Sequence, residues 1–289
     1  MIELPNKEEL IMKSNAMSLA AIISGLQLAN PSADIWTTCT EVQQDFIKQY
    51  LSGTLVDLQN LKEYLEGIVT SDSAVINKWF ADRGFPGMDI NIPLGGQGVG
   101  TVFDLLVDWE VAGKKRDIFL PSVTGVIEGV QMEPSSSMHA WTLEGYEHPM
   151  FELETRQDDW KVFIVETDEA PTNLELPQQA MHLLSRQRTP FQLNKLLFPS
   201  VEMNLDVDVS FLVGMHNDSG FSIDEAIKKV KLSLDDKGAR AQSAFYMVRR
   251  GLERGVYTID KPFYVIFWKD GLNFPAFVAI AAPEHWKKK

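Results

Sequence analysis

The residues that could carry catalysis or bind a metal are scattered along this sequence. The chain has five histidines and one cysteine, and none of the histidines lies at a metal-ligand spacing from another or from the cysteine. The three serines from Ser135 to Ser137 follow a proline in an expected loop, with no candidate base in register and no G-x-S-x-G elbow. We therefore expect no enzyme, no metal site and no cofactor. These histidines and the cysteine are His139, His148, His182, His216, His285 and Cys39.

A glycine-rich stretch could bind phosphate. It comprises Gly95, Gly96, Gly98 and Gly100, and it joins a strand-like run that begins at Met88 to a second apolar run. That order is found in nucleotide-binding loops, but the spacing is neither the dinucleotide fingerprint nor a phosphate loop with its lysine and hydroxyl. Nucleotide binding through Gly95–Gly100 is a remote alternative. The other interpretation is a flexible connection into a central strand, from Thr101 to Trp109.

The segment from Lys228 to Arg254 differs in charge from the rest of the chain. It holds eight basic and three acidic residues, a net of +5, whereas the whole chain carries −13, so the remainder carries −18. Read as a strand, it puts Ala239, Ala241, Ser243 and two larger apolar residues on one face and the polar groups on the other. Read by propensity, it is an amphipathic helix that ends at Gly255. Propensity favours the helix, and the sequence leaves both readings open.

Composition limits the class of protein. With 289 residues, 45% hydrophobic content and no low-complexity linker, the chain is expected to form a single domain, 1–289. One cysteine excludes an internal disulfide framework, and the acidic N-terminus does not resemble a signal peptide, so we expect a cytoplasmic monomer. The negative charge argues against nucleic acid as a partner, and the short apolar run from Ala16 to Ala29 indicates a buried helix and no membrane anchor.

Capping signals and apolar periodicity predict helices in the first third. Asn6 with Glu9, and Thr38 with Glu41, have capping-box spacing and precede apolar stripes. Leucines from Leu55 to Leu65 indicate a third helix, and 74–80 a short fourth. These stripes are expected to pack in the core.

The remainder is expected to be largely β-structure. The region 116–167 favours antiparallel strands, and 176–188 a short helix. The clearest alternation runs from Val201 to Val209, with the apolar residues facing inward and four polar residues facing outward. Two buried strands around Lys269–Gly271 predict a C-terminal hairpin.

Ordered motifs of the C-terminal two-thirds resemble the serpin family of protease inhibitors. GTVFDLLVDWE looks like the central strand of the family's main sheet, KVKLSLDDKGARAQSA like the strand and hinge before its reactive-centre loop, and IDKPFYVIFW with FPAFVAIAAPEHW like its closing strands. INKWFADR is similar to the end of the helix packed across the main sheet. The resemblance implies an α+β fold with large mixed and antiparallel sheets, a helical N-terminal third and an exposed loop at about 238–258.

The resemblance also implies a function and its residues. A trypsin-like serine protease, or a cysteine protease, would cleave the loop and be trapped when the cut loop inserts as a new strand. The implied reactive-bond candidates are Arg249, Arg250 and Leu252, with Arg250 preferred. The chain is shorter than usual for the family and its hinge is altered at Ala239, Arg240 and Gln242, so a non-inhibitory binding or structural protein is the alternative. The implied hinge residues are Gly238, Ala239, Arg240, Ala241, Gln242, Ser243 and Ala244.

Overall fold

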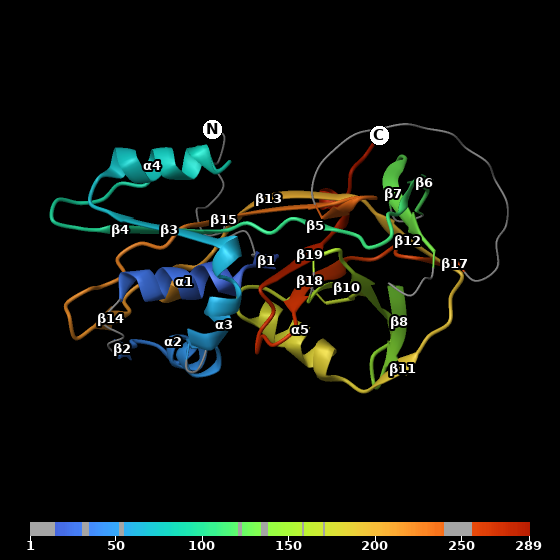
Figure 1. Cartoon of the computed structure of the whole chain (residues 1–289), viewed down its shortest axis with the longest axis horizontal. Helices are drawn as coiled ribbons and strands as arrows, with labels where there is room; N and C mark the ends of the chain where they lie inside the picture. Colours follow the sequence, from blue (N-terminus) through green and yellow to red (C-terminus); the bar gives the residue numbers. More distant parts are fainter. Residues whose placement is uncertain are drawn as a thin grey trace, which may run out of the picture.

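The protein has an α+β architecture. A computed structural model describes residues 15–30, 35–51, 55–120, 123–133, 138–157, 159–169, 171–239 and 256–289. Most helices lie in the first third and most strands follow them (Figure 1). The helices are α1 (Leu19–Ala29), α2 (Glu41–Phe46), α3 (Leu55–Asn60), α4 (Ser73–Asp82) and α5 (Glu175–Ser185), with short helical segments η1 (Ile47–Leu51), η2 (Lys62–Tyr64), η3 (Ser210–Leu212) and η4 (Pro283–His285).

A seven-stranded antiparallel sheet contributes much of the main core. Three of its strands, at 160–166, 263–269 and 277–281, are mostly apolar and buried on both faces, as expected for a sheet covered on both sides. The C-terminal hairpin expected around Lys269–Gly271 is confirmed. In spatial order the strands are β1 (Ala16–Met17), β19 (Phe277–Ala281), β18 (Phe263–Lys269), β10 (Trp160–Glu166), β9 (Met150–Glu154), β8 (Met138–Leu143) and β11 (Arg188–Pro190).

The other strands form one sheet of four and four separate pairs. Within the sheet of four, β17 and β12 are parallel and the remaining neighbours antiparallel. This sheet comprises β17 (Val256–Thr258), β12 (Lys195–Pro199), β7 (Ile127–Met132) and β6 (Lys114–Ile118). The pairs are β13 (Val201–Val207) with β15 (Lys228–Leu234), β3 (Leu65–Thr70) with β4 (Gly98–Phe103), β5 (Val107–Asp108) with β16 (Gly238–Ala239), and β2 (Trp36–Thr37) with β14 (His216–Asn217).

The alternation predicted from Val201 onward is present in β13. Val201, Met203 and Val207 are buried, whereas Glu202 and Asn204 are exposed. A slip of one residue against β15 would exchange these two sets, so burial of one face fixes the register.

Helices α1 and α4 cover opposite faces of the β3–β4 pair (Figure 1). On α1, the Ser18 hydroxyl accepts a hydrogen bond from the Ala21 N–H and so caps the helix, which buries one apolar face. On α4, Ile76 and Phe80 pack with Val102 of β4 in a second, smaller core. Among the described segments, no helix has the length and apolar character needed to cross a bilayer.

Several predicted boundaries were wrong. The capping box of α2 uses Thr40 and Gln43, because the Gln43 side chain reaches back to the Thr40 N–H, and Thr38 does not take part. Leu65 begins strand β3, because pairing with β4 overrides its place in the leucine stripe. Met17 lies in β1, where it pairs with Val278. The expected box at Asn6 lies outside the described residues.

The expected central strand, Thr101 to Trp109, is two strands in the structure. β4 ends at Phe103 and β5 begins at Val107, and each pairs with a different partner. The strand-like run that begins at Met88 forms no strand.

Truncating Ile164 should destabilise the protein strongly. This side chain is fully buried in β10 between Phe151 and Val265 of the neighbouring strands. Because Ile164→Ala leaves a cavity in a close-packed core, we expect a loss of about 2–5 kcal/mol in the free energy of unfolding, measured by urea denaturation. Val111→Ala is the control, since Val111 is 49% exposed and should change stability by less than about 0.5 kcal/mol. Equal losses from both substitutions would contradict this packing.

Candidate functional site

The hinge predicted at Gly238 is held against β5. Gly238 pairs with Asp108 and Ala239 with Val107, in antiparallel register. A Cβ atom at position 238 would collide with the carbonyl oxygen of Val107. Only glycine therefore permits this close approach of two backbones. We call the β5–β16 pair and the turn 235–237 the clasp.

The turn of the clasp is built around Asp235, which is buried. Its Oδ1 accepts hydrogen bonds from the N–H groups of Lys237 (2.8 Å) and Gly238 (3.3 Å). Its carbonyl oxygen accepts the indole N–H of Trp109 at 2.8 Å, and the Trp109 backbone N–H donates to the Lys237 carbonyl at 2.8 Å. These bonds fix where the chain leaves β15 and turns toward residue 240.

Below the clasp, β4 and β15 face each other across an open cleft. Among the described residues β4 pairs only with β3, and β15 only with β13. The cleft between them has a volume of about 1130 Å³. Its walls include Val99 and Thr101 on one side and Lys228 and Val230 on the other. Two sheet edges therefore flank a space that could accept an extended chain.

Helix α1 forms one side of this cleft with small residues. Ala21 and Gly25 line the cleft, and the Thr101 hydroxyl donates to the Ala21 carbonyl at 2.7 Å. From the other wall, Lys228 donates its Nζ to the Ser18 carbonyl at 2.6 Å. Both strand pairs are thus tied to α1 or its N-cap, Ser18, without pairing with each other.

Lys228 is the titratable group whose environment is most unusual in the cleft. Desolvation by the surrounding protein lowers the pKa of its ammonium to about 7. The residue lines the cleft and is half-buried. The lysine can therefore change its protonation state near neutral pH.

The other end of the predicted loop is anchored in a different sheet. β17 pairs with β12, and a buried carboxylate, Glu166, holds the chain that follows. Its Oε1 accepts the N–H groups of Asp260 (2.8 Å) and Lys261 (3.1 Å), and its Oε2 accepts the Tyr257 hydroxyl at 2.5 Å. Burial and the Glu166 charge raise the pKa of Tyr257, which keeps it a donor.

The structure places two of the predicted site residues, Gly238 and Ala239, in the clasp, where they pair with β5. The remaining hinge residues, from Arg240 to Ala244, and the candidates Arg249, Arg250 and Leu252 lie outside the described residues. The choice between a helix and an extended loop for this segment therefore also concerns residues outside the described ones. The assignment of the reactive bond remains a prediction.

The glycine-rich stretch has a packing role in this structure. Gly98 and Gly100 lie within β4, where a Cβ atom would press on Ile92 and Ile76, or on Phe80 and Ile68. Gly95 takes a positive φ of 84° in a turn. The stretch leads into a strand and not into a helix N-terminus, so it lacks the geometry that gives phosphate loops their affinity.

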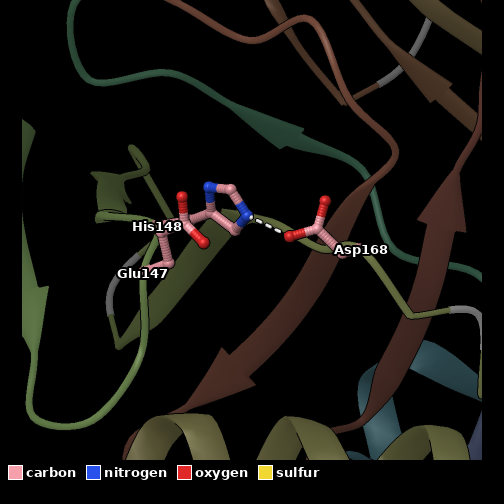
Figure 2. A group of neighbouring side chains, drawn as sticks. All are labelled: Glu147, His148 and Asp168. Atoms are coloured by element: carbon pink, nitrogen blue, oxygen red, sulfur yellow. Dashed lines mark hydrogen bonds and ion pairs between the residues drawn. The ribbon is translucent and has the colours of Figure 1, made fainter.

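One cluster was missed by the sequence reasoning. Glu147, His148 and Asp168 come together, and their ligand atoms all lie within 4.8 Å of one another (Figure 2). His148 and Asp168 belong to different segments, separated by β9 and β10, and no spacing rule links them. Only the pairing of those strands could have revealed their proximity.

Comparison with known proteins identifies the fold. No protein-family model matches the chain, and no curated protein sequence matches it. Among solved structures, Serpin48 of the insect Tenebrio molitor aligns with a TM-score of 0.61 at 11% identity, over 94% of this chain and 92% of that one. Uncleaved ovalbumin aligns with a TM-score of 0.61 at 12% identity, over 95% of each chain.

Human thyroxine-binding globulin, complexed with the hormone, aligns with a TM-score of 0.52 at 11% identity, over 91% of this chain and 96% of that one. The chain has the serpin fold. None of these three proteins is described as an enzyme. In this serpin fold the segment 238–258 begins at the clasp and ends in β17.

Replacing Gly238 should loosen the clasp. Because a methyl group at this position collides with β5, we expect Gly238→Ala to speed hydrogen exchange of the Trp109 backbone N–H at least tenfold, about 1.4 kcal/mol. Gly25→Ala is the control, since its Cβ would approach Thr101 no closer than 3.4 Å. Unchanged exchange at Trp109 in Gly238→Ala would show that the clasp tolerates a side chain.

Replacing Lys228 should change how stability depends on pH. An unfolded lysine has a pKa of about 10.4, so between pH 7 and about 10.4 the unfolded state binds more protons and wild-type stability rises with pH. Below pH 7 the cost of holding the ammonium in the cleft is fully present. Lys228→Met should therefore be more stable than wild type at pH 6, by up to a few kcal/mol, and less so at pH 9.

Urea midpoints of wild type and variant at the two pH values measure this difference. Lys231→Met, on the exposed face of the same strand, is the matched control for the loss of a lysine from β15. A Lys228→Met difference that is constant with pH would show that this ammonium is fully hydrated.

Proposed function

We propose that this protein inhibits a serine protease of trypsin-like specificity by insertion of its cleaved loop as a strand. The observation that supports it is the cleft between β4 and β15, two strands that lead in the chain into the two halves of the clasp, β5 and β16. Insertion requires a strand edge on each side of the cleft, an entry point next to the loop, and inserting side chains that fit the cleft.

The register of the clasp supports the fit. Gly238 lies opposite Asp108. If the same register continued along the chain, Ala241 would lie opposite Leu105 and Ser243 opposite Phe103. Leu105 and Phe103 both pack against the main core. Directly opposed residues in an antiparallel pair point to the same face, so the inserting strand would present small side chains to the core.

The same register gives Phe245 a position. It would lie opposite Thr101, whose side chain faces Ala21 and Gly25 of α1. Both are small residues of the helix surface that lines the cleft. An aromatic ring would therefore meet small side chains of α1 at this position.

Arg240 would fall on the outer face. It would lie opposite Leu106, which is 45% exposed, so its guanidinium could stay in water. An altered hinge residue of this kind avoids burial of an unpaired charge. The changed hinge would therefore still permit insertion.

The free energy that loop insertion could release is of the order needed to disrupt a protease. About ten new backbone hydrogen bonds at roughly 1 kcal/mol each would contribute on the order of 10 kcal/mol, before side-chain burial. That is comparable to the whole stability of a typical protease. The protease serine would attack the scissile carbonyl to form an acyl-enzyme, and insertion would have to precede its hydrolysis.

The second candidate function is a serpin fold that binds a ligand or serves a structural role without inhibition. It is favoured by the similarity to a thyroxine-binding globulin, described in complex with thyroxine. In this case a protease would cleave the loop as an ordinary substrate and dissociate without forming a stable complex.

Incubation with trypsin and with chymotrypsin tests the proposal. We expect a complex with trypsin that survives denaturing electrophoresis, and a rise in thermal stability of the cleaved protein. Mass spectrometry of the released fragment locates the bond, after Arg250 on the preferred assignment, after Arg249, or after Leu252 if chymotrypsin forms the complex. Cleavage without complex and without added stability would contradict inhibition and favour the second function.

A matched pair of variants tests the insertion register. Ser243→Arg would bury a charge on the core face and should convert the inhibitor into a substrate, lowering complex yield at least tenfold. Gln242→Arg puts the same charge on the outer face, opposite Asp104 in the continued register, and should leave the yield within about twofold. Similar yields from both variants would refute this register.

A further inference from the structure

The Glu147–His148–Asp168 cluster lies apart from the cleft. His148 Nε2 is 2.9 Å from Asp168 Oδ2, and Glu147 projects beside the imidazole ring (Figure 2). The side chain of His148 is only 8% exposed, whereas that of Asp168 is 58% exposed. The cluster is therefore open to solvent on the carboxylate side and buried on the histidine side.

The distances suit a small divalent cation. One imidazole nitrogen and two carboxylate oxygens, all within 4.8 Å of one another, form the set. In a tetrahedral zinc site with bonds of about 2.1 Å, ligand atoms are separated by about 3.4 Å. Small side-chain rotations would bring all three atoms to that separation, and water could supply the fourth ligand.

The surroundings of His148 resemble those of a metal ligand. Its second nitrogen, Nδ1, lies 3.8 Å from Oε2 of the buried Glu166. A histidine that binds a metal through one nitrogen usually directs the other toward a carboxylate or carbonyl, which fixes the tautomer. The ring of Tyr146 packs edge-on against His148 with centroids 5.8 Å apart and restrains its rotation.

The charges around the site also favour a cation. Glu147, Glu166 and Asp168 carry three negative charges, and the facing base is Lys261, whose Nζ pairs with Asp168 Oδ1 at 2.8 Å. With a neutral histidine the formal sum is −2. Lys261 occupies Oδ1 and leaves Oδ2 directed at His148, so the ion would replace a proton and not the lysine.

We propose that Glu147, His148 and Asp168 bind Zn²⁺. The site would lie next to the Glu166 carboxylate that holds residues 257–261, so zinc would stiffen the anchor that follows the predicted loop. The inference does not depend on the proposed function, because it concerns a separate group of residues.

Titration of the metal-free full-length protein with Zn²⁺ against a chromophoric chelator tests the proposal. We expect one equivalent to bind, and two-dimensional NMR of the five histidine rings to show the His148 resonances moving while the other four stay in place. Absence of stoichiometric binding, or movement of another histidine in place of His148, would overturn the assignment.

Variants distinguish a specific zinc site from the general tendency of zinc to bind histidine side chains. Asp168→Asn and Glu147→Gln change groups that are not buried, so they should fold, and each should weaken binding at least tenfold. His139→Gln is the control, because His139 also faces a carboxylate, Glu154 at 3.7 Å, but at an exposed position. Equal weakening by the control would show adventitious surface binding. Neither readout requires a protease, so the result stands whether or not the protein is an inhibitor.

Discussion

Backbone hydrogen bonding at two facing sheet edges is the constraint on which this molecule depends. An edge strand leaves N–H and C=O groups that must find water or another chain, and most proteins shield such edges. Here β4 and β15 face each other without pairing, and the contacts that hold them in position run to α1 through Thr101 and Lys228. The arrangement keeps the cleft open while the clasp fixes one end of it.

Two buried carboxylates hold the two ends of the predicted loop. Asp235 organises the turn of the clasp, and Glu166 organises the chain after β17. Each accepts backbone N–H groups, which are fixed donors, so each carboxylate sets a backbone path rather than a side-chain contact. Loop insertion as proposed would extend the pairing of the first end toward β4 and leave the second end in place.

The sequence predicted the elements with the strongest periodicity. The alternation of β13 and the apolar C-terminal hairpin were correct because burial of one or both faces leaves only one favourable register. Predictions failed where pairing decided the outcome. Leu65 fits a leucine stripe as well as it fits a strand, and only β4 beside it selects the strand. The apolar run from Thr101 to Trp109 carries no signal for its division, since that depends on which partner each half meets.

The sequence by itself determined that helices precede a strand-rich remainder, and which face of β13 is buried. It could do so because side-chain periodicity acts locally along the chain. The tertiary structure decided that β4 and β15 stay apart over α1, and that His148 meets Asp168. These features join residues far apart in the chain, and such contacts arise from packing that no local pattern encodes.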